Sequence, residues 1–369
     1  MGETAGAVVV GGGVVGASVA YHLAARGVRD VIVLDRGAAA GEGSTGRATG
    51  GFRVQFAHAV DVRLSLLARA ALERFADETG GDAGFVRRGY LWIAEDDAEL
   101  RALHDALAVQ RANGVTDAVA LDREGVVARN PAVRDAPLAG GTFCASDGFI
   151  KPLQILDGYR RAAERLGATF RWGVEANAFD IARDGRIAAV RHRGGAIATP
   201  IVVNAAGPWS AAVASWASVA LPVVPLRRHV TVTAPTAALP DAMPMTIYAG
   251  DGFHFRVRDG RVLLLAPDAD PVAAARARVP ALANVAIDRD AGWSGLYEMS
   301  PDGHAIVGAA PGVPNLYFAN GSSGHGVMHA PALGALIAEI VVDGAARSLD
   351  VSALRPDRFT AAAGIARVL

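Results

Sequence analysis

Apolar runs alternate with glycine-rich turns along the first part of the chain. The valines Val8–Val10 predict a short buried strand of a parallel sheet. An apolar segment from about Val14 to Arg26 predicts a helix, which Gly27 ends. The run RDVIVLDRG then predicts a second strand that ends at Asp35. The chain therefore opens with a strand, a tight turn, a helix and a second strand.

The later part of the chain shows the same mixture of strand and helix patterns. VVNAAG, residues 202–207, predicts a buried strand that ends in glycine, and residues 152–166 predict a helix followed by a strand. Residues 221–267 alternate short β-rich runs, with RDGR at 258–261 as a hairpin turn. A last apolar segment, from about His325 to Val342, predicts a helix. We therefore expect a mixed α/β protein.

The first turn holds a phosphate-binding pattern. Its G-x-G-x-x-G glycines are Gly11, Gly13 and Gly16. They allow the chain to turn, the backbone to approach a pyrophosphate, and the helix to pack closely on the strand. The helix that starts at Val14 and Val15 would direct its N-terminus at the phosphates. Asp35, nineteen residues after the last glycine, can accept hydrogen bonds from a ribose, and Arg36 follows it. Together these features predict dinucleotide binding.

The segment GSTGRATGGFR, residues 43–53, cannot build a core, because it carries four glycines and two arginines. After a nicotinamide-binding pattern, regular alternation of strand and helix would continue. Here the long glycine-rich segment suits a second contact with a longer cofactor that bears a flavin. Ser44, Thr45 and Gly46 can supply backbone and hydroxyl donors to the pyrophosphate. The sequence therefore favours FAD over a nicotinamide cofactor.

Composition narrows the class of protein further. The net charge of −1 gives no electrostatic signal for nucleic-acid binding. The only cysteine, Cys144, permits no intrachain disulfide and no multi-cysteine metal site, and we interpret it as a small buried residue. The N-terminal segment lacks the basic residues of a signal peptide, and no long apolar run is free of helix breakers. We expect a cytoplasmic protein without a membrane span.

Several segments resemble the FAD-dependent D-amino-acid-oxidase-like superfamily. The resemblance is to the branch of sarcosine oxidase, dimethylglycine dehydrogenase and the β-subunits of heterotetrameric sarcosine oxidase and L-proline dehydrogenase. It rests on VVVGGGVVGASVAYHLAARG, GSTGRATGGFRVQF, VVNAAGPWS, GLYEMSPDGHAIVG and LYFANGSSGHGVMHAP. The resemblance implies a Rossmann-like FAD-binding domain interleaved with a substrate domain built on a large mixed β-sheet. The expected FAD-binding domain is 1–78, 145–215 and 300–369, and the expected substrate domain is 79–144 and 216–299.

The motifs and the resemblance together give the residues expected to contact FAD. They are Gly11, Gly13, Val14, Val15, Gly16, Asp35, Arg36, Ser44, Thr45, Arg47, Gly50, Gly51, Val174, Ala205, Gly207, Trp209, Gly324, His325, Gly326, Val327 and Met328. Simple sarcosine oxidases link FAD to a cysteine where this chain has Gly295. The dimethylglycine dehydrogenase branch has a flavin-linked histidine where this chain has Arg47. We therefore expect noncovalent FAD.

The resemblance also implies candidate substrate-contacting residues. Arg53 occupies the position of an arginine that binds the substrate carboxylate, and a guanidinium offers a fixed bidentate fork for that group. Tyr248 and His254 alternate with Arg256 along one expected strand and are candidates to face the substrate. His325 opens the last helix, whose N-terminus would stabilise negative charge on the flavin. His325 and His329 lack a third ligand, so we expect no metal.

The expected activity is oxidation of the C–N bond of an amino acid, with a secondary or N-methyl amine as the leading substrate. The alternatives are a D-amino acid, a primary amino acid, an opine or a natural-product amine, or a flavin-bearing subunit that needs a partner. The family's oxygen-activating lysine has no counterpart, because the sole lysine, Lys151, lies far along the chain from that position. The electron acceptor, O2 or another carrier, and the oligomeric state stay open.

Overall fold

The computed structural model describes residues 2–133 and 137–359. Its first layer is a six-stranded sheet in the order β10-β3-β2-β14-β21-β20. The bounds of these strands are Thr169–Trp172, Val31–Asp35, Ala7–Val10, Val202–Asn204, Leu316–Asn320 and Ile306–Ala309. All neighbours pair in parallel except β20, which runs antiparallel to β21. The sheet is thus of the parallel type that the opening pattern predicts.

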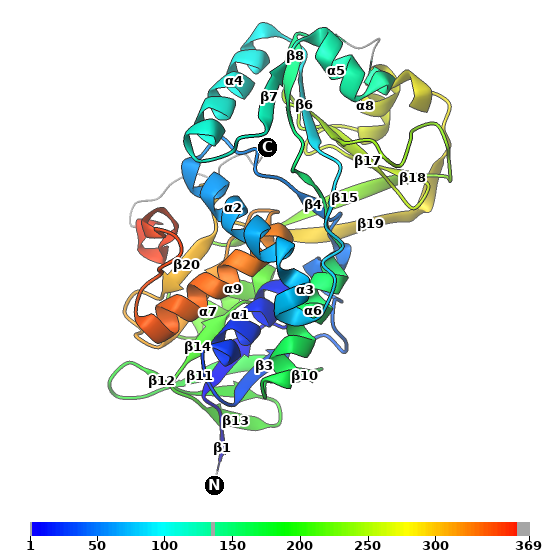
Figure 1. Ribbon diagram of the computed structural model, residues 1–369. Helices are drawn as coiled ribbons and strands as arrows, with labels where there is room; N and C mark the ends of the chain where they lie inside the picture. Colours follow the sequence, from blue (N-terminus) through cyan, green and yellow to red (C-terminus); the bar gives the residue numbers. More distant parts are fainter. Residues whose placement is uncertain (1, 134–136, 360–369) are drawn as a thin grey trace.

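Each face of this sheet supports a different layer. Along β2, Ala7 and Val9 pack with the helices, whereas Val8 and Val10 pack on the opposite side, because strand residues alternate between faces. The helices on the first side are α1 (Val14–Ala25), α2 (Ala59–Glu73), α3 (Phe75–Thr79), α6 (Pro152–Arg165) and α9 (Gly326–Asp343). The other side is covered by a sheet of β1 (Glu3–Thr4), β13 (Gly195–Ala198), β12 (Ile187–His192) and β11 (Ala176–Ile181). Figure 1 shows these layers around α1 and α9.

The second large sheet has eight strands in the order β19-β15-β18-β17-β16-β6-β8-β7. Their bounds are Ile287–Met299, Val224–Thr233, Arg261–Leu265, His254–Arg258, Met245–Tyr248, Tyr90–Ala94, Gly140–Cys144 and Ala118–Leu121. The pair β16 and β6 is parallel and the others are antiparallel, so the sheet is mixed, as expected. Helices α4 (Asp97–Ala112), α5 (Arg123–Arg129) and α8 (Pro271–Arg278) lie at the far end of the molecule (Figure 1).

Short elements join the two large sheets. Strands β4 (Gly51–Phe52), β9 (Gly148–Phe149) and β5 (Val86–Arg87) form a small antiparallel sheet. A 3-10 helix at Ser44–Arg47, another at Gly207–Trp209 and helix α7 (Ser210–Ser215) follow strands of the first sheet. The expected domain boundaries stay a prediction, although the strands of the two sheets come from alternating stretches of the chain.

The predicted hairpin turn RDGR and the predicted strand of Tyr248 and His254 can be compared with the structure. RDGR is the turn of the hairpin β17–β18, with positive φ angles at Asp259 and Gly260. Tyr248 and His254 do not share a strand, because β16 ends at Tyr248 and a turn containing Gly252 leads into β17 at His254. Gly250, Asp251 and Gly252 lie between the two residues, and the positive φ of Gly252 helps to turn the chain between two antiparallel strands.

Helix α9 is long and apolar enough to cross a membrane by length and composition, with a mean hydropathy of 1.4 over its 18 residues. However, 61% of that window is buried inside the protein. Its side chains share a core with α1, α2 and α6. This packing is typical of the central helix of a folded domain.

Candidate active site

Two adjoining cavities lie between the sheets. The larger, of about 690 Å³, lies beside the ends of β2, β3 and β14 and the start of α1. The smaller, of about 180 Å³, is lined mainly by the eight-stranded sheet and by the segment that contains β4. Residues that line both are Arg47, Ala48, Gly295, Tyr297, Gly324 and Val327. A ligand in the larger cavity would therefore border the contents of the smaller one.

The glycine turn fits tightly at one end of the larger cavity. A Cβ atom on Gly11 would lie 2.3 Å from the Ala205 carbonyl oxygen, and the φ of Gly11 is +107°. A Cβ on Gly16 would lie 1.8 Å from the Gly11 oxygen, so Gly16 packs the helix onto the turn and does not line the cavity. Only glycine suits these two positions.

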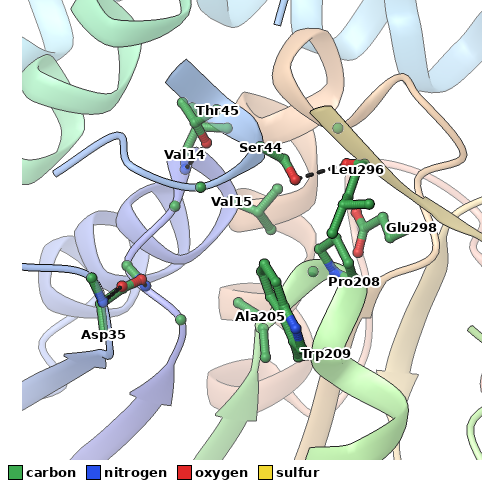
Figure 2. Close-up of a pocket in the computed structure, with 18 of the residues that line it drawn as sticks. Val14, Val15, Asp35, Ser44, Thr45, Ala205, Pro208, Trp209, Leu296 and Glu298 are labelled. Atoms are coloured by element: carbon green, nitrogen blue, oxygen red, sulfur yellow. Dashed lines mark hydrogen bonds between the residues drawn. The ribbon is translucent and has the colours of Figure 1, made fainter. Parts of the chain in front are cut away.

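Asp35 fixes the shape of this turn (Figure 2). Its two carboxylate oxygens accept hydrogen bonds from the backbone N–H groups of Gly12 and Gly37, both at 2.7 Å. Asp35 also lines the cavity. Since each carboxylate oxygen can accept more than one hydrogen bond, binding of a ribose by Asp35 stays a prediction.

The segment from Ser44 to Arg47 ties the first helix to strand β19. Thr45 Oγ1 accepts a hydrogen bond from Val14 N at 3.1 Å, and Ser44 Oγ donates to Leu296 O at 2.7 Å (Figure 2). The one hydroxyl proton of Ser44 is thus already used, but Ser44 lines the larger cavity, and its expected contact with the cofactor stays a prediction. The Trp293 indole N–H also donates to Arg47 O at 2.8 Å.

The other expected cofactor contacts divide between the cavities. Arg36 and Trp209 both line the larger cavity, where the guanidinium lies 3.8 Å from the centre of the indole ring. Val174 lines neither cavity, and its N–H donates to Asp35 O at 2.9 Å. Val15, Gly207 and Gly326 line the larger cavity, as do Gly13, Val14 and Ala205. Gly50, Gly51, His325 and Met328 line only the smaller cavity.

Glu298 is a cavity residue that the sequence reasoning missed. Its Oε1 accepts a hydrogen bond from Ser322 N at 3.3 Å, whereas buried Oε2 has no hydrogen-bond partner among the described residues. Figure 2 shows the side chain beside Pro208 at the cavity. Burial raises the pKa of Glu298 to about 7. An unused buried acceptor among glycine backbones suits the hydroxyl and amide donors of a dinucleotide. The larger cavity therefore fits FAD.

Arg53 is held rigidly at the smaller cavity. It is 8% exposed, donates from Nη1 to Gln55 O, and stacks 3.9 Å from the centre of the Phe56 ring. Its Nη2 lies 3.0 Å from His325 Nε2. Burial lowers the pKa of Arg53, and Tyr90 and Asp147 oppose this effect. A guanidinium has no acceptor, so His325 Nε2 accepts this hydrogen bond.

A buried carboxyl supports the backbone around Arg53. Asp147 accepts hydrogen bonds from Val54 N at 2.7 Å and from Gln55 Nε2 at 3.1 Å. Burial raises the pKa of Asp147 to about 7, against these hydrogen bonds and the charge of Arg53. Asp147 therefore fixes the two residues that follow Arg53 in the chain.

Two histidines face the smaller cavity in the neutral state. Burial, followed by the charge of Arg53, holds the pKa of His325 well below its usual value. Burial also lowers the pKa of His254, whose Nδ1 lies 2.8 Å from Gly252 O. We assign the proton to Nδ1, because the carbonyl can only accept, and this leaves Nε2 of His254 as an acceptor.

Tyr248, Lys151 and Gly295 lie at positions that bear on the expected site. Tyr248 lines neither cavity; it is fully buried in the core of the eight-stranded sheet, with its hydroxyl 3.5 Å from Arg278 O. Lys151 is exposed before α6 and also lines neither cavity. A Cβ on Gly295 would lie 3.2 Å from the Arg47 Cβ, so there is little room for a cysteine there. Within residues 2–133 and 137–359, no cluster of three or more metal-ligating side chains occurs.

Comparison with known proteins agrees with this geometry. The family model described as FAD dependent oxidoreductase matches residues 7–340. The chain belongs to this family. The protein is therefore an FAD-dependent oxidoreductase, and the sequence predictions of the family, the cofactor and the mixed α/β fold are confirmed.

Individual relatives cover almost the whole chain. It is 28% identical to FAD-dependent oxidoreductase domain-containing protein 1 of Xenopus laevis, over 97% of this chain and 83% of that protein. It is 29% identical to glycine oxidase of Geobacillus kaustophilus, over 90% of this chain and 92% of that enzyme. The crystal structure of L-proline dehydrogenase from P. horikoshii superposes with a TM-score of 0.88 at 27% identity, covering 97% of this chain and 98% of that one.

Proposed function

We propose that this oxidoreductase oxidises the C–N bond of an amino acid, with a secondary or N-methyl amine as its main substrate. The reaction removes two electrons and two protons from the H–C–N–H unit and leaves an imine, which water hydrolyses. The observation that carries the proposal is a buried arginine, Arg53, in a small cavity that adjoins a cavity suited to FAD. The resemblance to L-proline dehydrogenase supports a secondary amine.

The chain's own residues would bind and orient the substrate. Arg53 would bind the α-carboxylate. Neutral His325 would hold the guanidinium in place by accepting a hydrogen bond from its Nη2–H group. His254 Nε2 would accept an N–H of the amine. When bound in the larger cavity, FAD supplies the two-electron acceptor. The glycine turn, Asp35, Thr45 and the helix of Gly207–Trp209 would hold it there.

The similarity to glycine oxidase favours a second candidate, a primary or D-amino acid. Substrate size would distinguish the two, because an N-substituent must fit the smaller cavity of about 180 Å³. Lys151 lines neither cavity, so the electron acceptor stays open between O2 and another carrier. A partner subunit or a homo-oligomer, and a cytoplasmic location, stay predictions.

The test is the replacement Arg53→Met, with each N-methyl amino acid compared with the amine that lacks its carboxylate. Anaerobic bleaching of the flavin spectrum would report kcat/KM for both. We expect the variant to lose roughly 2–5 kcal/mol of transition-state binding for the amino acid, because it leaves a carboxylate buried without its partner. The decarboxylated amine should be affected little.

The control for this test is Arg88→Met, which removes an exposed arginine. An equal loss for the amino acid and the amine would mean that Arg53 acts on the fold rather than on the carboxylate. No loss for either would contradict the proposed anchor. If no amino acid bleaches the wild-type flavin, the proposed reaction itself is wrong.

A further inference from the structure

The charged side chains that line the smaller cavity are basic. Among the described residues that line it are three arginines, Arg47, Arg53 and Arg228, and three histidines, His229, His254 and His325. No aspartate or glutamate of the described chain lines it. A cavity of about 180 Å³ with several cationic side chains and no acid is suited to an anionic ligand.

The three arginines differ in position. Arg47 is exposed and lines both cavities, and its Nη1 donates to Ser294 O at 3.3 Å. Arg53 and Arg228 line only the smaller cavity. Since burial keeps His254 and His325 neutral, with lowered pKa values, the fixed charges of this cavity are chiefly the guanidiniums of Arg53 and Arg228.

Arg228 comes from a different wall than Arg53. It lies in β15, in register with Gly295 of β19, whereas Arg53 follows β4. One nitrogen of Arg228, Nη1, donates to Pro267 O at 2.8 Å. In the described part of the chain, no carboxylate lies within 4.0 Å of the Arg228 guanidinium. Arg228 therefore keeps donors for a ligand and has no acidic partner in the described protein.

The two guanidiniums act on the same part of the cavity. After burial, the charges of Arg53 and Arg228 both help to lower the pKa of His254. Both charges also oppose the effect of burial on the pKa of Tyr297, which lines both cavities. Both guanidiniums also line the same cavity of about 180 Å³, so one small molecule in that cavity could contact both. Met245, Ile247 and Leu265 line the same cavity and offer an apolar surface for a short aliphatic spacer.

We propose that Arg228 binds a second anionic group of the substrate, so that the substrate is an amino acid with an acidic side chain or an acidic N-substituent. This inference rests on the proposed function, in which Arg53 binds the α-carboxylate. A substrate with one carboxylate would neutralise one guanidinium and leave the other uncompensated in a confined cavity. A dianion would neutralise both, and a guanidinium offers each carboxylate a bidentate contact.

The experiment compares acids with amides of nearly equal size. The substrates are N-methylaspartate and N-methylglutamate against N-methylasparagine and N-methylglutamine, with kcat/KM taken from anaerobic flavin bleaching. We expect the wild type to prefer the acids by roughly tenfold to a hundredfold, the usual effect of a hydrogen bond to a charged group. Arg228→Gln should bring this ratio close to one. Arg227→Gln, an exposed neighbour in β15, should keep the wild-type ratio.

A binding measurement separates this inference from the proposed reaction. Calorimetry of the flavin-loaded protein with glutarate and with its monoamide needs no turnover. If no amino acid bleaches the flavin but glutarate binds selectively and Arg228→Gln removes the selectivity, the reaction is wrong and the dianion site is supported. Equal use of acids and amides by the wild type would overturn the inference. An equal loss for all substrates in Arg228→Gln would also overturn it, because Arg228 would then act on the cofactor or the fold.

Discussion

The buried imidazole of His329 should make the protein sensitive to acid in a way that one substitution can remove. His329 is 2% exposed, and its Nε2 lies 2.9 Å from the buried Ser65 Oγ. Its ring packs against Phe56 and His325, behind Arg53. Burial lowers the pKa of His329 from 6.5 to about 4, with the charge of Arg53 acting in the same direction and Asp61 opposing it.

The sign follows from proton binding. Between the two pKa values the unfolded chain binds a proton at His329 and the folded protein does not, so the stability of the folded protein falls as the pH falls. One pKa unit corresponds to about 1.4 kcal/mol, so this residue alone should cost about 2 kcal/mol at about pH 5 and almost nothing at about pH 7.5. The cost reaches its limit of about 3 kcal/mol below the folded pKa of about 4.

The substitution His329→Phe removes this titration. At about pH 7.5 it should destabilise the protein by roughly 1–3 kcal/mol, because the Ser65 hydroxyl loses its buried partner. At about pH 5 the variant should regain about 2 kcal/mol relative to the wild type. Urea denaturation at both pH values, with FAD in excess, measures the free energy of unfolding of the two proteins. The contributions of the other buried histidines are common to both and cancel in the difference.

His104→Phe is the matched control, because His104 is exposed on α4. Its difference from the wild type should not change with pH. If the difference between His329→Phe and the wild type is also the same at both pH values, His329 is not held neutral by burial. The same reasoning, applied to the neutral state of His325 beside Arg53, would then fail as well.

Two further predictions concern the cofactor. Acid precipitation should release all FAD into the supernatant, because Gly295 and Arg47 cannot form the covalent links of related enzymes; a yellow pellet would contradict this. Gly11→Ala should weaken FAD binding at least about tenfold, since its Cβ would lie 2.3 Å from Ala205 O, and a titration with FAD would measure the loss. Gly167→Ala is its control, because Gly167 also has a positive φ, +94°, but no atom lies within 4 Å of the added Cβ; an equal effect of both would point to backbone strain alone.

The sequence was sufficient to predict the parts of the fold that local patterns determine. The expected first helix and second strand agree with α1 and β3, because apolar runs and glycines set their limits. The separate strands of Tyr248 and His254 had a sequence signal, because Gly250, Asp251 and Gly252 between them form a turn pattern that the expectation of one strand overlooked. Tyr248 does not line the smaller cavity because side chains alternate along β16: Met245 and Ile247 line that cavity, and Tyr248 packs in the core on the other face.

Sequence reasoning missed the site residues whose positions depend on pairing between distant segments of the chain. Arg228 faces the smaller cavity because β15 pairs with β19 over a long register, which no local motif indicates. Glu298 had a weak signal, a single acid in GLYEMSPDGHAIVG before its Ser-Pro-Asp turn. Its unused Oε2 becomes evident only when the chain around Ser322 is placed beside it.

Strand β19 explains why cofactor and substrate effects should be difficult to separate in this protein. Because strand side chains alternate between faces, successive residues of β19 have different surroundings. Leu296 and Glu298 line only the larger cavity, whereas Gly295 and Tyr297 line both. The same strand pairs with β15, which carries Arg228. A shift of β19 would therefore move the proposed FAD contacts and the proposed second anion site together. For this reason a variant of Arg228 is informative only through the ratio between acid and amide substrates, since an effect on the cofactor alone changes both rates equally and leaves their ratio unchanged.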